Sequence, residues 1–214
     1  GNQPLSRFLR NKGPKEGYTF EDIGPRGLHY QESYASCAAG DYDNDGDLDL
    51  FVTTAYATAS FGKKNYPVLL RNEGKWKFKD ASKLHGLAKL NATYQGAWAD
   101  FDNDGDLDLA AAGKLFVNQG NENQWLKVKL QGDGNEVNYC AIGAQAKIKL
   151  KDRILTRQVE AGTGQGNQND MTLHYGLGGQ KGPVEMQIYW PNGTEQKCTI
   201  EKVNKLVQIS YKTM

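Results

Sequence analysis

Long apolar runs, a disulfide framework and an excess of one charge sign are all absent from this sequence of 214 residues. No apolar stretch approaches the roughly 18 residues of a membrane-spanning helix, so we expect no membrane span. Three cysteines are too few for a disulfide scaffold, and their odd number leaves at least one unpaired within a monomer. Whether Cys140 and Cys198 form a bridge stays open, and Cys37 is expected to be a buried small hydrophobe within a run of small residues.

A convincing amphipathic-helix pattern is also missing. Twenty-five glycines and 10% aromatic residues instead favour many short strands joined by turns. A hydrophobic content of 38% argues against wholesale disorder. We therefore expect an all-β protein.

The near-zero net charge hides a strong segregation of charges. The chain has 26 Lys and Arg residues against 25 Asp and Glu residues, but ten of the acidic residues lie in segments 41–50 and 100–109. The rest of the chain has 15 acidic residues against 26 basic ones. The two segments read DYDNDGDLDL and DFDNDGDLDL, differ at one position and lie 59 residues apart. This near-identity is an internal repeat.

A fainter repeat runs alongside the first. Residues 8–13, 69–74 and 115–120 each contain an apolar pair, an asparagine and a glycine. A period of roughly 45 to 60 residues with this pattern indicates stacked β units, such as propeller blades.

The character of the chain changes at about residue 124. Four later segments have the period-two pattern of half-buried strands: 125–130, 146–151, 184–190 and 205–211. Glycine-rich turns lie between them. We therefore divide the chain into a repeat domain, 1–123, and an antiparallel β-sandwich, 124–214.

Carboxylates occupy alternate positions of both acidic segments. Counting the first aspartate as position 1, aspartates stand at positions 1, 3, 5, 7 and 9 of each: Asp41, Asp43, Asp45, Asp47, Asp49, Asp100, Asp102, Asp104, Asp106 and Asp108. Calcium takes six to eight oxygens at roughly 2.3–2.6 Å. Gly46 and Gly105, at position 6, permit the positive φ that such a turn needs. We predict two Ca²⁺ sites.

The even positions of both loops are largely apolar. We expect these side chains to point into the adjoining sheet and anchor the loops: Tyr42, Leu48, Leu50, Phe101, Leu107 and Leu109.

Other interpretations of the loops fit less well. An EF-hand needs a bidentate glutamate at position 12 and flanking helices, whereas position 12 is Val52 or Ala111. A magnesium site would need fewer carboxylates in tighter octahedral geometry. In a solvated acidic turn without metal, five carboxylates within ten residues would repel one another.

These motifs resemble a known family. The loop DxDNDGDLDL is similar to the calcium loop of FG-GAP/VCBS repeats. The segments AIGA at 141–144, LHYGLG at 173–178 and WPNGTEQ at 190–196 resemble the ASPIC/UnbV domain that follows such repeats in the cartilage acidic protein-like family. The resemblance covers nearly the whole chain from about residue 5.

The resemblance implies a ligand set and a location. Positions 1, 3, 5 and 9 would coordinate through side chains, and position 7 (Asp47 or Asp106) through its backbone carbonyl. The family is secreted, calcium-binding and associated with the extracellular matrix or cell surface, or with the periplasm or cell surface in bacteria. It has no agreed catalytic residues, so we expect a non-enzymatic structural, adhesion or protein-interaction module. A calcium-dependent enzyme of secondary metabolism is a less favoured alternative.

The repeat domain holds material for only two or three blades, whereas propellers normally close with four to eight. An open stack leaves strand edges exposed, which proteins usually protect. Three outcomes stay open: a longer parent chain, edge pairing with another chain, or a cap formed by the sandwich.

A basic stretch at residues 63–83 supports an alternative function, binding of carbohydrates or acidic glycans. Within it, segment 75–79 (KWKFK) is expected to place three lysines on one strand face. The simpler interpretation is a solvated edge strand that its lysines protect from pairing.

No recognition motif supports nucleic-acid binding. Asn91 and Asn192 lie in N-glycosylation triplets, whose use depends on the source.

Overall fold

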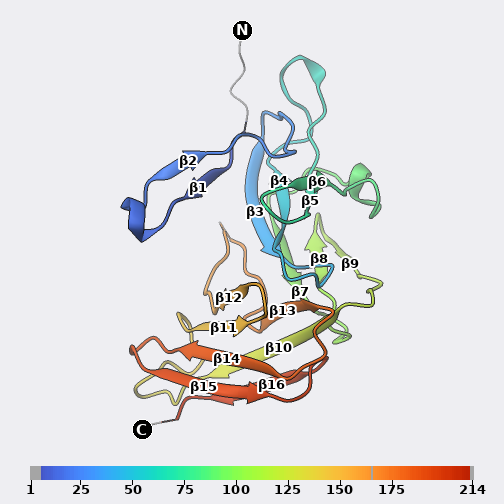
Figure 1. Ribbon diagram of the computed structural model, residues 1–214. Coiled ribbons are helices and arrows are strands. Elements are labelled where there is room, and N and C mark those ends of the chain that lie inside the picture. Colours follow the sequence, from blue (N-terminus) through green and yellow to red (C-terminus); the bar gives the residue numbers. More distant parts are fainter. Residues whose placement is uncertain (1–5, 165, 213–214) are drawn as a thin grey trace. The chain divides into compact units, whose positions relative to one another are not determined.

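The computed structural model describes residues 6–164 and 166–212, and it is all-β, as predicted (Figure 1). The chain forms two compact units. The first contains Gly1–Ala39 and Leu48–Gly96, and the second contains Gly40–Asp47 and Ala97–Met214. The predicted domain boundary after residue 123 stays a prediction; residue 124 is the first residue of strand β10.

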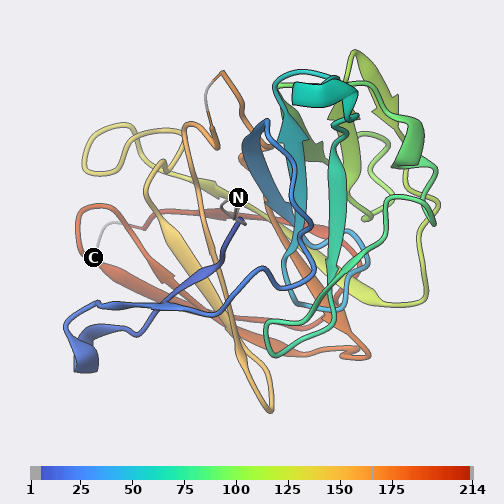
Figure 2. The ribbon, with the colours of Figure 1, turned by 90° about the horizontal axis from the view of Figure 1, so that it is seen from above.

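The first unit contains a hairpin and a four-stranded sheet. The hairpin pairs β1 (Leu9–Asn11) with β2 (Phe20–Asp22), and the single turn η1 (Pro14–Glu16) lies at its tip (blue in Figure 2). The sheet has the order β3 (Tyr34–Gly40), β4 (Asp49–Thr54), β5 (Val68–Asn72) and β6 (Phe78–Asp80). Two further single turns are η2 (Ser60–Gly62) and η3 (Leu87–Lys89). Val52, Val68 and Leu70 form the core of this unit.

Two predictions for the first unit are wrong. Cys37 is exposed because the alternation of β3 turns Ala38 and Gly40 inward and leaves Cys37 on the opposite face. The three lysines of segment 75–79 do not share one strand face, since β6 begins only at Phe78. Lys75 and Trp76 have left-handed φ values of 52° and 61° and belong to the turn that precedes it.

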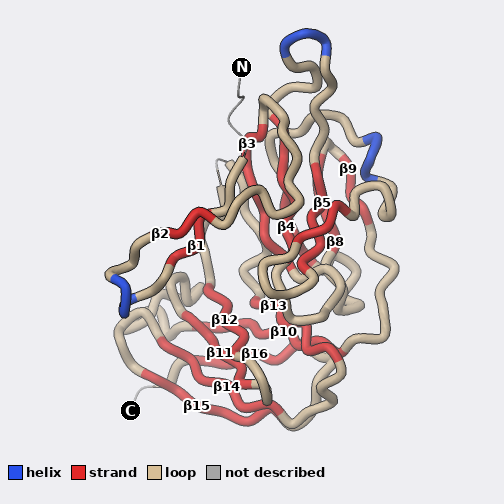
Figure 3. The backbone as a smooth tube through the Cα atoms, turned by 45° about the horizontal axis from the view of Figure 1, so that its top comes forward, coloured by secondary structure: helices blue, strands red, loops and turns tan. Residues whose placement is uncertain are grey.

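The second unit contains a three-stranded sheet and two sheets that pack as a sandwich. The small sheet has the order β7 (Gly96–Ala99), β8 (Asp108–Ala111) and β9 (Lys114–Phe116). One sandwich sheet has the order β13 (Leu173–Gly178), β10 (Gln124–Gln131) and β16 (Leu206–Ser210). The other has the order β12 (Ile154–Gln158), β11 (Gln145–Lys149), β14 (Val184–Tyr189) and β15 (Glu195–Ile200) (Figure 3).

Alternating side chains build the sandwich core. Val184, Met186 and Ile188 of β14 point inward, and their neighbours Glu185 and Gln187 do not. The period-two pattern thus gives each strand one apolar face, and the inward faces of both sheets share one buried cluster.

The sandwich is not wholly antiparallel, which corrects the prediction. β10 pairs with β13 in antiparallel fashion but with β16 in parallel, with Lys127 opposite Leu206. A period-two pattern indicates which face of a strand is buried, but it carries no information about the direction of the neighbouring strand.

Among the described residues, no sheet closes into a barrel or propeller, and no helix is long and apolar enough to cross a membrane. The three cysteines are free thiols, so Cys140 and Cys198 are not bridged.

Strand β13 is buried along almost its whole length, and this places the candidate site. Leu173, Tyr175 and Leu177 belong to the sandwich core. His174 and Gly176 are buried too, although they alternate with the core residues. They contact the aspartate loops of the second unit, as described next.

Candidate metal centres

Both aspartate loops have the same backbone geometry. Asn44 and Asn103, at position 4, have φ values of 56° and 64°, and Gly46 and Gly105, at position 6, have φ values of 95° and 97°. Glycine adopts positive φ without penalty, and asparagine tolerates the left-handed region better than most residues. The identical Asn and Gly positions therefore encode two sharp bends in each loop.

Three carboxylates of the second loop converge. Asp100, Asp102 and Asp108 each present one oxygen, and these oxygens lie within 4.8 Å of one another. Asp100 and Asp108 are buried, and Asp102 is exposed. In the first loop, Asp41 is buried and Asp43 half-buried within the second unit.

Hydrogen bonds fix the second loop around this group. Asp100 Oδ2 accepts a hydrogen bond from the backbone N–H of Gly105 at 3.0 Å. Asp108 accepts from the N–H groups of Phe101 and Asn118, both at 2.8 Å. Asp108 therefore joins the start of its loop to the segment after β9.

One oxygen of the position-1 carboxylate is the main evidence for a metal ion. The Asp100 side chain is 1% exposed, yet its Oδ1 is buried with no hydrogen-bond partner among the described residues. The same is true of Oδ1 of Asp41, whose side chain is 0% exposed. A buried carboxylate oxygen without a partner is costly. A bound cation would satisfy it, so the residues present fit a metal ion.

Positions 5 and 7 have other partners. The Asp104 carboxylate accepts from the N–H of Asp106 at 2.9 Å, and the Asp45 carboxylate from the N–H of Asp47 at 2.8 Å. Asp106 accepts from the Asn44 amide at 2.8 Å, so the two loops touch. In the second loop the structure thus brings positions 1, 3 and 9 together, while position 5 stands outside this group.

The position-7 side chains also point to partners outside the converging groups. Asp47 forms an ion pair with Arg153 at 3.1 Å. Burial, with repulsion from neighbouring aspartates, raises the pKa of Asp106 to about 6. A backbone-carbonyl role for position 7 stays a prediction.

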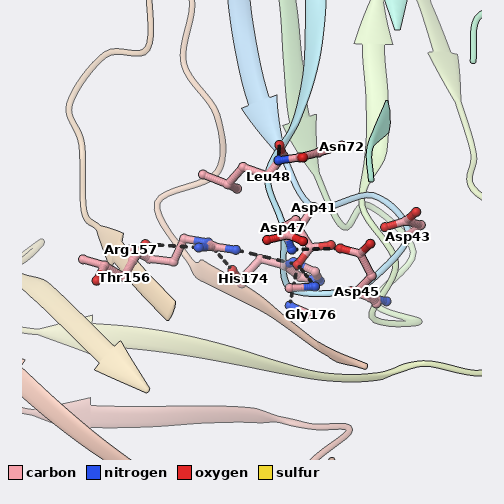
Figure 4. Close-up of polar contacts among 12 residues, drawn as sticks. Asp41, Asp43, Asp45, Asp47, Leu48, Asn72, Thr156, Arg157, His174 and Gly176 are labelled. Carbon is pink, nitrogen blue, oxygen red and sulfur yellow. Dashed lines mark hydrogen bonds and ion pairs between the residues drawn. The ribbon is translucent and has the colours of Figure 1, made fainter. Parts of the chain in front are cut away.

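The first loop lies against β13 and β12 of its own unit (Figure 4). Asp41 Oδ2 accepts from the N–H groups of Gly46 and Gly176 at 3.0 and 3.1 Å. Arg157 Nη2 lies 3.7 Å from the same oxygen. Burial raises the pKa of Asp41 to about 7 although Arg157 opposes the shift. Asp49 begins β4 in the first unit, where it accepts from the N–H of Asn72 at 2.7 Å.

The predicted anchoring by even positions holds for most residues. Tyr42, Leu107 and Leu109 are buried, and Leu48 and Leu50 are half-buried. Phe101 is 68% exposed, which makes that prediction wrong. Tyr42 stacks on Trp98 at a centroid distance of 6.3 Å.

Sequence reasoning missed three residues that the sandwich contributes to the loops. Lys127 of β10 donates to Asp100 Oδ2 at 2.7 Å, Arg157 pairs with Asp41, and His174 Nε2 lies 2.9 Å from the carbonyl oxygen of Gly105. His174 lies in segment 173–178, and nothing in the sequence of that segment indicates its partner in the loop. Lys127 and Lys129 both alternate with apolar residues in the sequence, yet Lys127 is buried and Lys129 is exposed.

We expect His174 to make stability depend on pH. Because a carbonyl only accepts, Nε2 carries the proton, and burial lowers the pKa of His174 to about 4 from an ordinary 6.5. The folded state then binds fewer protons than the unfolded state between these values, so stability is lost as the pH falls through this window. The slope approaches about 1.4 kcal/mol per pH unit.

The His174→Gln variant retains an N–H donor and cannot titrate. In metal-free buffer its melting temperature should therefore fall less than that of the wild type when the pH is lowered from 6.5 to 4.5. Parallel curves for the two proteins would contradict the assignment. His85→Gln, at an exposed position in the first unit, serves as the matched control.

Comparisons with known proteins agree with part of the resemblance. Residues 134–214 match the family model described as ASPIC and UnbV. Over 206 residues the chain is 26% identical to cartilage acidic protein 1 of Mus musculus, covering 90% of this chain and 31% of the relative. The chain is 25% identical to the Homo sapiens protein of the same name, over 90% of this chain and 30% of that relative. The chain thus spans less than a third of the length of these relatives. The ASPIC/UnbV domain is confirmed, and the FG-GAP assignment of the preceding residues stays a prediction.

Proposed function

We propose that this chain is an extracellular, calcium-binding β module in which each aspartate loop holds one Ca²⁺ ion and rigidifies a surface used for protein interactions. The observation that carries the proposal is Oδ1 of Asp100, which is buried, has no hydrogen-bond partner within residues 6–164 and 166–212, and lies beside the carboxylates of Asp102 and Asp108. A buried carboxylate oxygen without a hydrogen-bond partner is costly, and a bound cation would satisfy it.

The donor atoms favour calcium. Every converging side chain offers carboxylate oxygen, the ligand type of hard cations, and none offers sulfur or imidazole. Three carboxylates, with backbone carbonyls and water, reach the six to eight oxygens of calcium more readily than the octahedral shell of magnesium.

A structural rather than a switching role follows from the packing of the loops. Buried side chains from the even positions and hydrogen bonds from β13 hold the loop residues in place before any ion binds. The ion therefore stabilises an existing arrangement. Cartilage acidic protein 1, by its name, places the relatives in cartilage, which supports an extracellular setting and a partner there. We propose no catalytic role.

A calcium titration tests the proposal. By isothermal titration calorimetry the chain should bind two Ca²⁺ ions, and Asp102→Asn should remove one of them because it neutralises a converging carboxylate. Asp102 is exposed, so its replacement should leave the fold intact.

Asp152→Asn is the matched control, since Asp152 is an exposed aspartate of the same unit outside the loops. It should retain both sites. A wild-type chain that binds no calcium, or an Asp102→Asn variant that still binds two ions, would refute the proposal.

A further inference from the structure

The position-1 aspartates are shared between the loops and the sandwich. In the second loop, Lys127 Nζ of β10 lies 2.7 Å from Asp100 Oδ2, and the two side chains are 6% and 1% exposed. The same ammonium lies 3.1 Å from Asn103 Oδ1. A positive charge is thus buried against the carboxylate whose other oxygen, Oδ1, lacks a partner among the described residues.

The first loop has the same sequence around its glycine but a different cation. Arg157 Nη2 lies 3.7 Å from Asp41 Oδ2, beyond hydrogen-bond distance, and that oxygen accepts two backbone N–H groups instead. Arginine also spreads its charge over a planar guanidinium, whereas the lysine ammonium is a compact point charge. The first loop also meets a second cation, because Arg153 pairs with Asp47 at 3.1 Å. The closest contact between a cation and a position-1 carboxylate is nevertheless that of Lys127 with Asp100.

We propose that Lys127 lowers the calcium affinity of the second loop. The inference rests on the proposed function, since it concerns the same loops. Its cause is repulsion between two cations that compete for one buried carboxylate. Such repulsion is strong where water is excluded and weak at the surface.

The same contact stabilises the second loop when calcium is absent. Lys127 neutralises Asp100 and so supplies part of the charge that the ion would bring. Coupling between two ligands of one site is reciprocal. A variant without the lysine should therefore be less stable in metal-free buffer and gain more from calcium than the wild type does.

The test uses a chain with one site at a time. In an Asp43→Asn background, which removes the first site, calcium is titrated into proteins with Lys127 or Lys127→Met. We expect Lys127→Met to bind calcium about tenfold more tightly, within the range typical of coupling between two charges at one site. Lys129→Met, an exposed lysine of the same strand, is the matched control and should leave the affinity unchanged.

A second variant covers the case in which methionine prevents folding. Lys127→Gln keeps a hydrogen-bond donor beside Asp100 and removes only the charge, and it should also bind more tightly. In the Asp102→Asn background, which isolates the first loop, Lys127→Met should change the affinity less than threefold, as expected for a charge that acts on the nearer loop.

The outcomes separate the two proposals. Equal or weaker calcium binding by both Lys127 variants would overturn the inference while leaving the proposed function intact. A complete lack of binding in both single-site backgrounds and in the wild-type chain would overturn the proposed function, and the inference with it.

Discussion

Removing calcium should lower the free energy of unfolding of the calcium-loaded chain by about 5 kcal/mol. An ion that binds only the folded state at a hundredfold excess over its Kd stabilises that state by about 2.7 kcal/mol, and the chain has two loops. In a domain of this size 1 kcal/mol corresponds to about 2–4 °C, so the melting temperature should fall by about 10–20 °C. The physical reason is that Oδ1 of Asp41 and of Asp100 lose the cation that compensates their burial.

The measurement is a pair of calorimetric scans, one in millimolar calcium and one in metal-free buffer. Asp102→Asn should lose about half of the shift and Asp152→Asn none of it. Magnesium at the same concentration should reproduce little of the shift, because the loops offer more carboxylates than an octahedral magnesium site uses. If the scans with and without calcium coincide, neither loop is a metal site.

The loops could be predicted from the sequence because their information is local. Asparagine at position 4 and glycine at position 6 encode positive φ wherever they stand, and the structure has φ between 56° and 97° at all four positions. The inward faces of strands such as β14 follow in the same way from period-two alternation. Neither inference depends on which distant segments meet.

Other features that the sequence did not reveal depended on such long-range contacts. Lys127 and Lys129 have the same local pattern, and only the approach of the second loop to β10 buries the first of them. Phe101 and Tyr42 occupy the same loop position, but Tyr42 finds Trp98 to stack on while Phe101 stays exposed. The parallel pairing of β10 with β16 likewise joins segments about 80 residues apart. Local pattern decides which side of a strand is apolar, whereas long-range packing decides which polar residues become buried.

Gly105→Ala should destabilise the second unit by about 3 kcal/mol, the combined effect of backbone strain and overpacking. At φ 97° an alanine is strained whatever space surrounds it. An ideal Cβ there would also lie 1.8 Å from Cε2 of Trp125, so the loop or the indole must move. A displaced loop would weaken the hydrogen bond from His174 to the carbonyl of Gly105 and disturb the convergence of Asp100, Asp102 and Asp108. Chemical denaturation in calcium should report this loss, and calcium affinity at the second loop should fall with it.

Gly134→Ala separates the two causes of that loss. Gly134 has φ 79°, and its ideal Cβ would meet nothing within 4 Å, so its substitution adds left-handed strain alone, about 1 kcal/mol. The remaining 2 kcal/mol or so of the Gly105→Ala effect is then the collision with the indole. Trp125→Ala combined with Gly105→Ala should recover much of that part, because a double-mutant cycle isolates the interaction between two residues in contact. Equal losses for the two single glycine variants would mean that the indole does not press on the loop, and the packing of the second loop against β10 would be refuted.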